Sequence, residues 1–271
     1  MIADANQLKT LYDANGYLIA IPVLNKNELD LARKEYEKLE EKFSKEYCQF
    51  NLHNLHMQYE WVMNLAVHPN VLKAITAILG PDVILLDCRF ICKYSSSDVP
   101  LQDNKAQHVA WHQDMKYWGI KGGAVVSAWI AFDDVDKENG VLQVIPGSNK
   151  KSVLEHGPGT VTTDMMRAQQ QIPNHLVQVE EAVECPLKAG EMSVHDGLTI
   201  HASEPNISNR QDHSPANRRR CGLVFRYIPT CAYPIENTEY PRSFPAAVLV
   251  AGKDEFQKFK NNAPSFFTKT F

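Results

Sequence analysis

The feature that most constrains this chain is a series of short apolar segments, each bounded by residues that favour turns. Five segments are rich in Val, Ile, Phe and Trp and are separated by clusters of Gly, Pro, Asn and Asp: residues 83–94, 124–132, 141–145, 191–195 and 221–228. No helical pattern of about 10–15 residues alternates with them, so a parallel sheet with crossover helices is not expected. The pattern predicts a mainly β, α+β fold, an antiparallel sandwich or barrel such as a jelly roll.

The first third of the chain has a different pattern, which predicts helices. Asn25, with Glu28 three residues later, is typical of a capping box. The apolar residues that follow recur at helical spacing: Leu29, Ala32, Tyr36, Leu39 and Phe43. Residues 70–79 repeat the pattern, and Gly80 and Pro81 predict its end. A short extended piece over residues 16–21 precedes both helices, which we expect to pack outside the β core.

Length and composition suit one globular domain. The chain has 271 residues, of which 44% are hydrophobic and 22% charged, values typical of an ordered protein with a sizeable core. We expect a single domain over residues 1–271, with helical support over 1–82, the jelly-roll core over 83–230 and a C-terminal extension over 231–271. The predicted loops at 95–108, 150–175 and 205–218 are long enough to be candidates for function.

The charge balance disfavours two classes of partner. The 28 basic and 32 acidic side chains leave a net charge of −4, which gives no reason to expect nucleic acid or an anionic membrane as a partner. No apolar run approaches the roughly 20 residues needed to cross a bilayer, and no secretory signal is expected. The six cysteines include no Cys-x-x-Cys pair, so we expect reduced thiols in a cytoplasmic protein. We also expect the protein to be a monomer or a homodimer.

A metal site is predicted by two separated motifs. His112 and Asp114 stand at i and i+2, so an extended backbone projects both to the same side. The spacing alone is common, but His201 in a later segment offers a third ligand. Two imidazoles and one carboxylate form the facial arrangement of non-haem Fe(II) oxygenases, which leaves three coordination positions open. His195 is the alternative third ligand. If His201 is the ligand, we expect His195 to lie in the core or to line the pocket.

The three open positions suit a bidentate 2-oxoacid and O₂, and the far carboxylate of that acid needs an anchor. Arg220 begins a predicted strand that we expect to return antiparallel beside the one that carries His201. A planar guanidinium matches a carboxylate through paired hydrogen bonds. Ser203, two residues past His201, offers a further hydroxyl donor.

At these residues the chain resembles the phytanoyl-CoA dioxygenase family of Fe(II)/2-oxoglutarate-dependent oxygenases. The resemblance runs from about residue 83 to residue 230. It rests on residues 111–114 (WHQD) with 117–119 (YWG), on 128–132 (AWIAF), on 138–148 (ENGVLQVIPGS), on 190–193 (GEMS) with 201–203 (HAS), and on 220–223 (RCGL) ahead of 226–229 (RYIP).

The resemblance implies a double-stranded β-helix, a cupin-like jelly roll, with iron at its mouth. It implies that His112, Asp114 and His201 bind Fe(II) and that Arg220 binds the 5-carboxylate of 2-oxoglutarate. The spacing of 19 positions from His201 to Arg220 exceeds the usual spacing because of an apparent insertion at 211–216, so Arg218 and Arg219 stay open as alternative anchors. Halogenating relatives replace the carboxylate with a small residue, so the presence of an aspartate disfavours halogenation.

The function expected from this resemblance is the oxidation of an unactivated C–H of a small polar metabolite, with release of succinate and CO₂. Hydroxylation is the first expectation. Oxidative cyclisation or desaturation with the same cofactors is the alternative, followed by a cupin-like metal enzyme or a binding protein that does not use 2-oxoglutarate. The residues expected to flank the metal and contact substrate are Lys93, Gln107, Lys116, Tyr117 and Trp118, although loop residues facing water, or Tyr117 or Trp118 packed beneath the metal strand, fit the sequence as well.

Overall fold

The computed structural model describes residues 4–49, 51–95, 107–157, 171–208, 218–235 and 243–268. Its α-helices are α1 (Ala5–Asn15), α2 (Lys26–Phe43), α3 (Lys45–Cys48), α4 (Glu60–Ala66), α5 (Pro69–Leu79) and α6 (Met115–Trp118). Its strands are β1 (Tyr17–Pro22), β2 (Val83–Lys93), β3 (Val109–His112), β4 (Ile120–Lys121), β5 (Val126–Ala131), β6 (Leu142–Val144), β7 (Val183–Cys185), β8 (Glu191–Asp196), β9 (His201–Ser203), β10 (Arg220–Pro229), β11 (Tyr233–Pro234) and β12 (Val248–Ala251). The five predicted strands all form, with ends within two residues of those expected.

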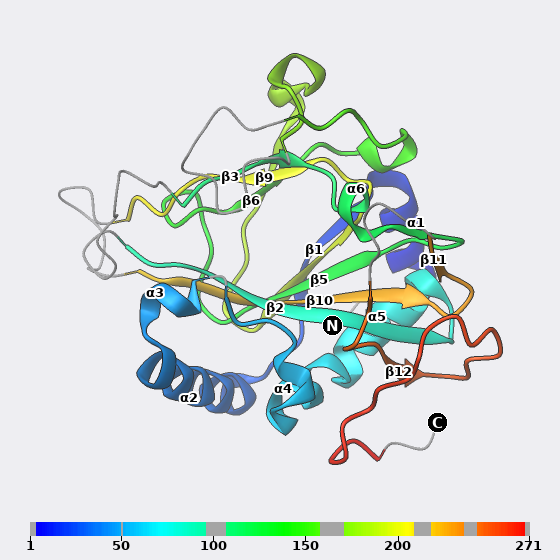
Figure 1. Cartoon of the computed structure of the whole chain (residues 1–271). Coiled ribbons are helices and arrows are strands. Elements are labelled where there is room, and N and C mark those ends of the chain that lie inside the picture. The colour runs from blue at the N-terminus through cyan, green and yellow to red at the C-terminus, as the bar shows by residue number, and fades with distance from the viewer. Residues whose placement is uncertain are drawn as a thin grey trace.

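Two antiparallel sheets face each other (Figure 1). The larger has six strands in the order β1-β8-β5-β10-β2-β12, and the smaller has four in the order β3-β9-β6-β7. A separate two-stranded ribbon joins β4 and β11. This arrangement confirms the predicted mainly β jelly roll, although β1 and β12, at the edges of the larger sheet, lie outside the range expected for its core.

Each long strand of the larger sheet has two different faces. On β10, Cys221, Leu223, Phe225 and Tyr227 are wholly buried in the core beneath the helices. The intervening residues of the strand point between the two sheets, because successive side chains of a strand alternate in direction. The sheet therefore packs against helices through one face and lines the interior of the sandwich with the other.

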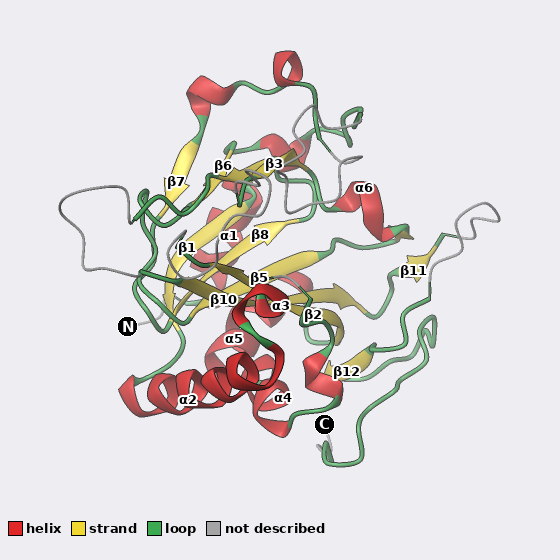
Figure 2. Ribbon diagram, turned by 60° about the vertical axis from the view of Figure 1, so that its left-hand side comes forward, coloured by secondary structure: helices red, strands yellow, loops and turns green. Residues whose placement is uncertain are grey.

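The helices α2, α4 and α5 cover the outer face of this sheet (Figure 2). The predicted capping box forms, since the Asn25 side chain accepts from the backbone of Glu28 while the Glu28 carboxylate accepts from the backbone of Asn25. On α2, the buried residues Leu29, Ala32, Tyr36 and Leu39 are members of the predicted stripe. The helix α1 was not expected; it precedes β1 and ends at Gly16, which has the left-handed conformation.

Among the described residues, no single helix has the length and apolar character needed to cross a membrane. Only α4 and α5 taken together, bent by 46° at their break, meet both criteria. All six cysteines are free thiols, and five of them are buried.

The expected pairing of the Arg220 strand is wrong. β10 pairs with β2 and β5 in the larger sheet, while His201 lies on β9 in the smaller one. An alternating apolar pattern predicts which residues share a face of a strand, but it does not specify the neighbouring strand. Arg220 therefore approaches the predicted metal site from the opposite sheet. The apparent insertion at 211–216 lies outside the described residues.

Candidate metal and cosubstrate site

The three predicted metal ligands converge. His112 ends β3 and pairs in register with His201, the first residue of β9. Asp114 follows at the start of α6, where the backbone has turned from extended to helical. One ligand atom from each of the three residues lies within 4.8 Å of the other two, and all three side chains are buried. The predicted His-Asp-His cluster is thus confirmed as a geometry that can hold one ion.

Hydrogen bonds orient both imidazole rings. The Nδ1 atom of His112 lies 2.8 Å from the carbonyl oxygen of Ala110, and Nδ1 of His201 lies 2.9 Å from that of Thr199. A carbonyl can only accept, so each Nδ1 carries the proton and each Nε2 has a free lone pair for a metal. Burial, with two other histidines nearby, lowers the pKa of His201 well below its ordinary value and keeps the ring neutral, as a ligand must be.

The carboxylate of Asp114 is held at one oxygen and open at the other. Ser127 Oγ donates to Oδ2 over 3.0 Å, and Arg226 Nε lies 3.6 Å from the same atom. The second oxygen, Oδ1, faces His112 Nε2 at 3.6 Å. Burial opposes ionisation, but the Arg226 guanidinium and the nearby imidazoles outweigh it and hold the pKa of Asp114 well below its usual range.

The side chains of His112, Asp114 and His201 line a cavity, and His195, the alternative third ligand, lines the same cavity. Its Nε2 lies 3.9 Å from Asp114 Oδ2, on the side away from the metal-facing oxygen, and its ring centroid is 4.5 Å from that of His201. It is not part of the cluster of three ligand atoms found among the described residues. The geometry thus assigns the third ligand to His201 and gives His195 a place in the cavity wall.

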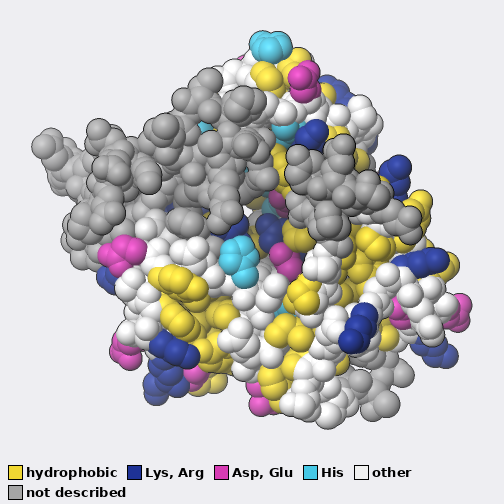
Figure 3. Space-filling view, in the orientation of Figure 1, with side chains coloured by type: hydrophobic (Ala, Val, Ile, Leu, Met, Phe, Trp, Pro, Cys, Tyr) yellow, Lys and Arg dark blue, Asp and Glu magenta, His cyan; other side chains and the backbone are white. Residues whose placement is uncertain are grey.

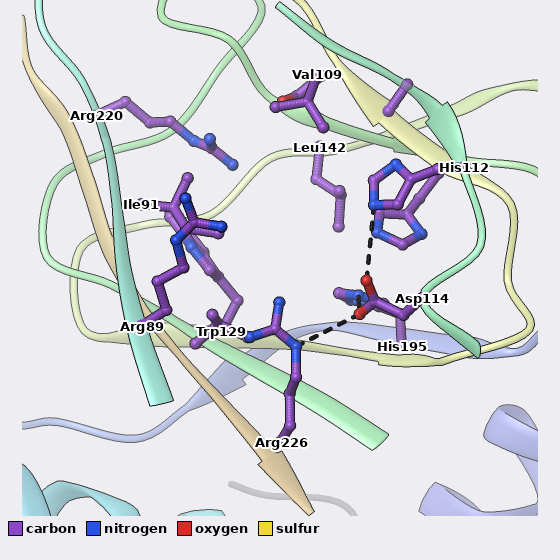
Figure 4. A pocket seen from close by; sticks show the side chains of 14 residues that line it. Arg89, Ile91, Val109, His112, Asp114, Trp129, Leu142, His195, Arg220 and Arg226 are labelled. Atoms are coloured by element: carbon purple, nitrogen blue, oxygen red, sulfur yellow. Dashed lines mark ion pairs between the residues drawn. The ribbon is translucent and has the colours of Figure 1, made fainter. Parts of the chain in front are cut away.

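Arg220 reaches the cavity from the facing sheet, as Figure 4 shows. The side chain is buried, and its guanidinium carbon lies 4.6 Å from the centre of the Trp129 ring. Burial lowers its pKa to about 10. Within the described part of the chain, its Nε–H has no hydrogen-bond partner. A buried donor of this kind needs an acceptor, and the carboxylate of a bound 2-oxoacid supplies one, so the donor set fits the predicted cosubstrate.

The two alternative anchors are engaged elsewhere. Arg218 forms ion pairs with Asp136 and Glu138. Arg219 donates to both carboxylate oxygens of Glu40 and also pairs with Asp133. Neither arginine lines the cavity. Arg220 is therefore the one member of the run that faces the metal ligands.

Ser203 lines the cavity, and its environment explains the position of Lys93. The Lys93 ammonium lies 2.7 Å from Ser203 Oγ and also donates to the backbone carbonyls of Ser203 and Glu204. Its side chain is wholly buried and links β2 to the smaller sheet. The predicted contact of Lys93 with substrate is not seen at the cavity wall; the residue connects the two sheets instead.

The other four predicted substrate residues also lie outside the cavity wall as the structure describes it. Gln107 is buried and its amide donates to Gln49, whereas Lys116 is exposed. The Tyr117 ring lies perpendicular to the His156 ring, and Trp118 packs on a core cluster and beneath the Arg226 guanidinium. The cluster that Trp118 packs on includes residues of β2 and β10 but none of β3, so the alternative packing beneath the metal strand is not seen. Substrate contact by these residues stays a prediction.

Four functional candidates were not predicted: Arg89, Ser127, Trp129 and Arg226. Three of them line the cavity, and Ser127 holds Asp114 from the neighbouring sheet. Charged and histidine side chains are visible in a central hollow of the molecular face in Figure 3. The sequence contained a signal for Arg89 and Arg226, since each is a charged residue that stands between apolar residues inside a predicted strand.

Comparison with known proteins agrees with this site. The sequence model of the phytanoyl-CoA dioxygenase (PhyH) family matches residues 12–213. The peroxisomal phytanoyl-CoA dioxygenase of Bos taurus is 29% identical over 89 residues, covering 32% of this chain and 25% of that protein. L-proline trans-4-hydroxylase of Streptomyces griseoviridis is 30% identical over 142 residues, covering 46% and 51%. The chain thus spans between a quarter and about half of these curated relatives.

Solved structures share the fold at low sequence identity. The apo form of the non-haem monooxygenase ThoJ superposes with a TM-score of 0.72 at 21% identity, covering 96% of this chain and 90% of that one. The epimerase SnoN, in complex with Fe³⁺, α-ketoglutarate and a nogalamycin compound, gives 0.66 at 18% identity, covering 86% of each chain. The family model matches residues 12–213, most of the chain, so this chain belongs to the phytanoyl-CoA dioxygenase family.

Proposed function

We propose that this protein is an Fe(II)- and 2-oxoglutarate-dependent dioxygenase that hydroxylates an unactivated C–H of a small polar metabolite. The observation that carries the proposal is the convergence of His112, Asp114 and His201 from one sheet on a buried Arg220 from the other. When bound together, Fe(II), 2-oxoglutarate and O₂ supply an oxidant strong enough to attack such a bond, with release of succinate and CO₂.

The protein's own residues bind, orient and exclude water. Three protein ligands would occupy half of an octahedral shell and leave the rest for cosubstrate and O₂. Arg220, held against Trp129, would fix the far carboxylate of 2-oxoglutarate and so set its direction at the metal. Because all three metal ligands are buried, little bulk water reaches the reacting atoms.

Hydroxylation is favoured over the other outcomes by the proline hydroxylase, whose similarity extends over 142 residues. A cupin-like enzyme or binding protein without 2-oxoglutarate would have no use for the Arg220 Nε–H, to which no described residue offers an acceptor. The structural neighbours also include an epimerase, SnoN, and a carbocyclase, SnoK, so product analysis belongs in the test.

The test is an anaerobic titration with Fe(II) and 2-oxoglutarate, followed through the visible charge-transfer band of the complex. We expect the band in the wild type and its loss in Asp114→Ala and in His201→Ala. The control His175→Ala removes an exposed histidine and should keep the band. Admission of O₂ with a panel of small polar metabolites should then produce succinate and a hydroxylated product. Absence of the band in the wild type, or its persistence in both ligand variants, contradicts the proposal.

A further inference from the structure

Two thiols meet in the core between β2 and β10. Cys92 and Cys221 stand directly opposite each other on these neighbouring antiparallel strands, and their Sγ atoms lie 2.8 Å apart. Both side chains are wholly buried on the face of the sheet that packs beneath the helices. They form a thiol pair that the proposed function does not use.

The strand pairing supplies the geometry that a disulfide needs. Residues directly opposite on antiparallel strands have Cα atoms about 4.5–5.5 Å apart, and disulfides span Cα distances of about 4.4–6.8 Å. The register of β2 and β10 is continuous from Arg220 to Arg226, and its irregularity comes only after Arg226. A bond between the two sulfurs therefore fits the native register of the strands.

The other four thiols have different surroundings. Cys48, in the same core cluster, and Cys185 each direct the thiol toward a backbone carbonyl. Cys88 lies 3.1 Å from an imidazole nitrogen, and Cys231 is exposed. Among the residues that the structure describes, the thiol pair is thus the one place where two sulfurs are in contact.

A polar cavity on the outer side of the sheet gives a small oxidant a way toward the thiol pair. The Tyr36 hydroxyl lies 2.9 Å from Cys92 Sγ and 2.9 Å from the Tyr94 hydroxyl. Tyr94 in turn donates to Glu40, and both line a cavity of about 800 Å³. Along these contacts, two side chains separate the cavity from the sulfur. Burial raises the pKa of the Cys221 thiol well above its ordinary value, so the reaction is slow.

We propose that Cys92 and Cys221 form a reversible disulfide when the protein meets a peroxide. One sulfur attacks an oxygen of H₂O₂, the O–O bond breaks, and a sulfenic acid and one water result. The facing thiol then attacks this sulfur, and the hydroxyl leaves as a second water. In total the two thiols lose two protons and two electrons. Since the partner thiol is already in contact, the sulfenic acid is consumed before it is oxidised to the irreversible sulfinic acid.

The bond would lie directly behind the cosubstrate anchor. Arg220 precedes Cys221 on β10 and projects from the opposite face of the sheet into the site cavity. The two cysteines are 129 positions apart, and cross-links that close long loops restrict the unfolded chain most. The oxidised protein would therefore hold β10 in the register that directs Arg220 to the metal ligands. This inference does not depend on the proposed function.

The test is a peptide map of the oxidised wild-type protein. Native full-length protein is treated with hydrogen peroxide, its remaining thiols are blocked with N-ethylmaleimide, and it is digested with trypsin without reduction. Trypsin releases the two cysteines on residues 90–93 and 221–226. We expect mass spectrometry to find these peptides linked in most chains once Cys231 is fully oxidised, and dithiothreitol to separate them. The oxidised protein should melt about 3–7 °C above the reduced protein.

Matched variants identify the partners. Cys48→Ala and Cys185→Ala should keep the link, whereas Cys221→Ala should abolish it and leave sulfinic acid on Cys92; circular dichroism checks that each variant folds. If Cys221→Ala does not fold, the wild-type peptide map decides. The proposal is overturned if residues 90–93 stay unlinked when Cys231 is fully oxidised, if they are linked to the Cys48 peptide instead, or if the linked protein melts no higher than the reduced one.

Discussion

Replacement of Gly222 by alanine tests how the cosubstrate anchor is built. Gly222 lies on the inner face of β10, two residues beyond Arg220, where the Trp129 indole covers it. A Cβ atom at this position would lie 1.9 Å from Cζ2 and 2.1 Å from Cε2 of that ring. Real contacts of a Cβ never come this close, so the indole must move. Because the Arg220 guanidinium rests on the same ring at 4.6 Å, the anchor must move with it.

The magnitude follows from two separate effects. Overpacking of a core costs about 1–3 kcal/mol. With an unfolding entropy of about 2.1 cal/mol/K per residue over 271 residues, that corresponds to a fall in Tm of about 2–5 °C. Loss of the stacked guanidinium is worth about 0.5–2 kcal/mol, which raises the Kd for 2-oxoglutarate about 2–30-fold.

Thermal melting and the charge-transfer titration measure these effects separately. The Gly222→Ala/Trp129→Phe double variant removes Cζ2 and relieves the clash, so the alanine should cost less in this background than in the wild type. Its affinity for 2-oxoglutarate should stay low because the indole is absent. Gly157→Ala is the control, since no atom of the described residues lies within 4 Å of the added carbon. An unchanged Tm and Kd in Gly222→Ala, or a full penalty in the double variant, refutes the reasoning.

Three further predictions concern the surroundings of the site. Ser127→Ala removes the neutral hydrogen bond to Asp114 and should weaken Mn(II) binding about tenfold, as measured by titration; unchanged affinity would show that Arg226 alone holds the carboxylate. Burial lowers the pKa of His56, so the folded protein resists a proton that the unfolded chain accepts below about pH 6.5. The free energy of unfolding should therefore fall with pH below that value, by at most about 1.4 kcal/mol per pH unit from this group. Urea denaturation of His56→Gln should show a shallower decline; an equal slope would contradict it. Lys93→Met should lower the free energy of unfolding by about 2–4 kcal/mol because it removes the buried bridge between the sheets, and a loss below about 0.5 kcal/mol would contradict that role.

The metal ligands could be predicted because their chemistry is local and specific. His112 and Asp114 are two positions apart, and only His201 and His195 offered a third ligand in a suitable segment. The capping box at Asn25 was predictable for the same reason, since all its partners lie within four residues. Local patterns of this kind depend on backbone geometry that a few neighbouring residues determine.

Long-range placement was less accessible. The strand that carries Arg220 was assigned to the wrong sheet, since alternation is equally satisfied by any partner that buries the same face. Arg89 and Arg226 were overlooked although both interrupt apolar strands. Ile91 on β2 and Val224 on β10 stand two positions away from these arginines and therefore share their face of the sheet, the inner face. A charged side chain on that face indicates a cavity between the sheets. Trp118 is adjacent to the metal motif in the sequence, yet it packs on a core cluster and beneath Arg226, so adjacency in the sequence does not by itself bring a side chain to the cavity wall.

The alternation of side chains along β10 does not specify its neighbouring strands, but it does specify the register in which the strand pairs. A shift of β10 by one residue would turn Arg220 and Arg226 into the apolar core beneath the helices and bring Leu223 and Phe225 into the cavity. An unpaired guanidinium in such a core costs several kcal/mol. The cost of two is comparable to the whole free energy of unfolding of a typical domain. The wrong register is thus excluded by the residues that perform the chemistry. The charged residues on the inner face weaken the sheet as a packing surface. They also specify the one alignment of β10 in which Arg220 and the metal ligands face each other.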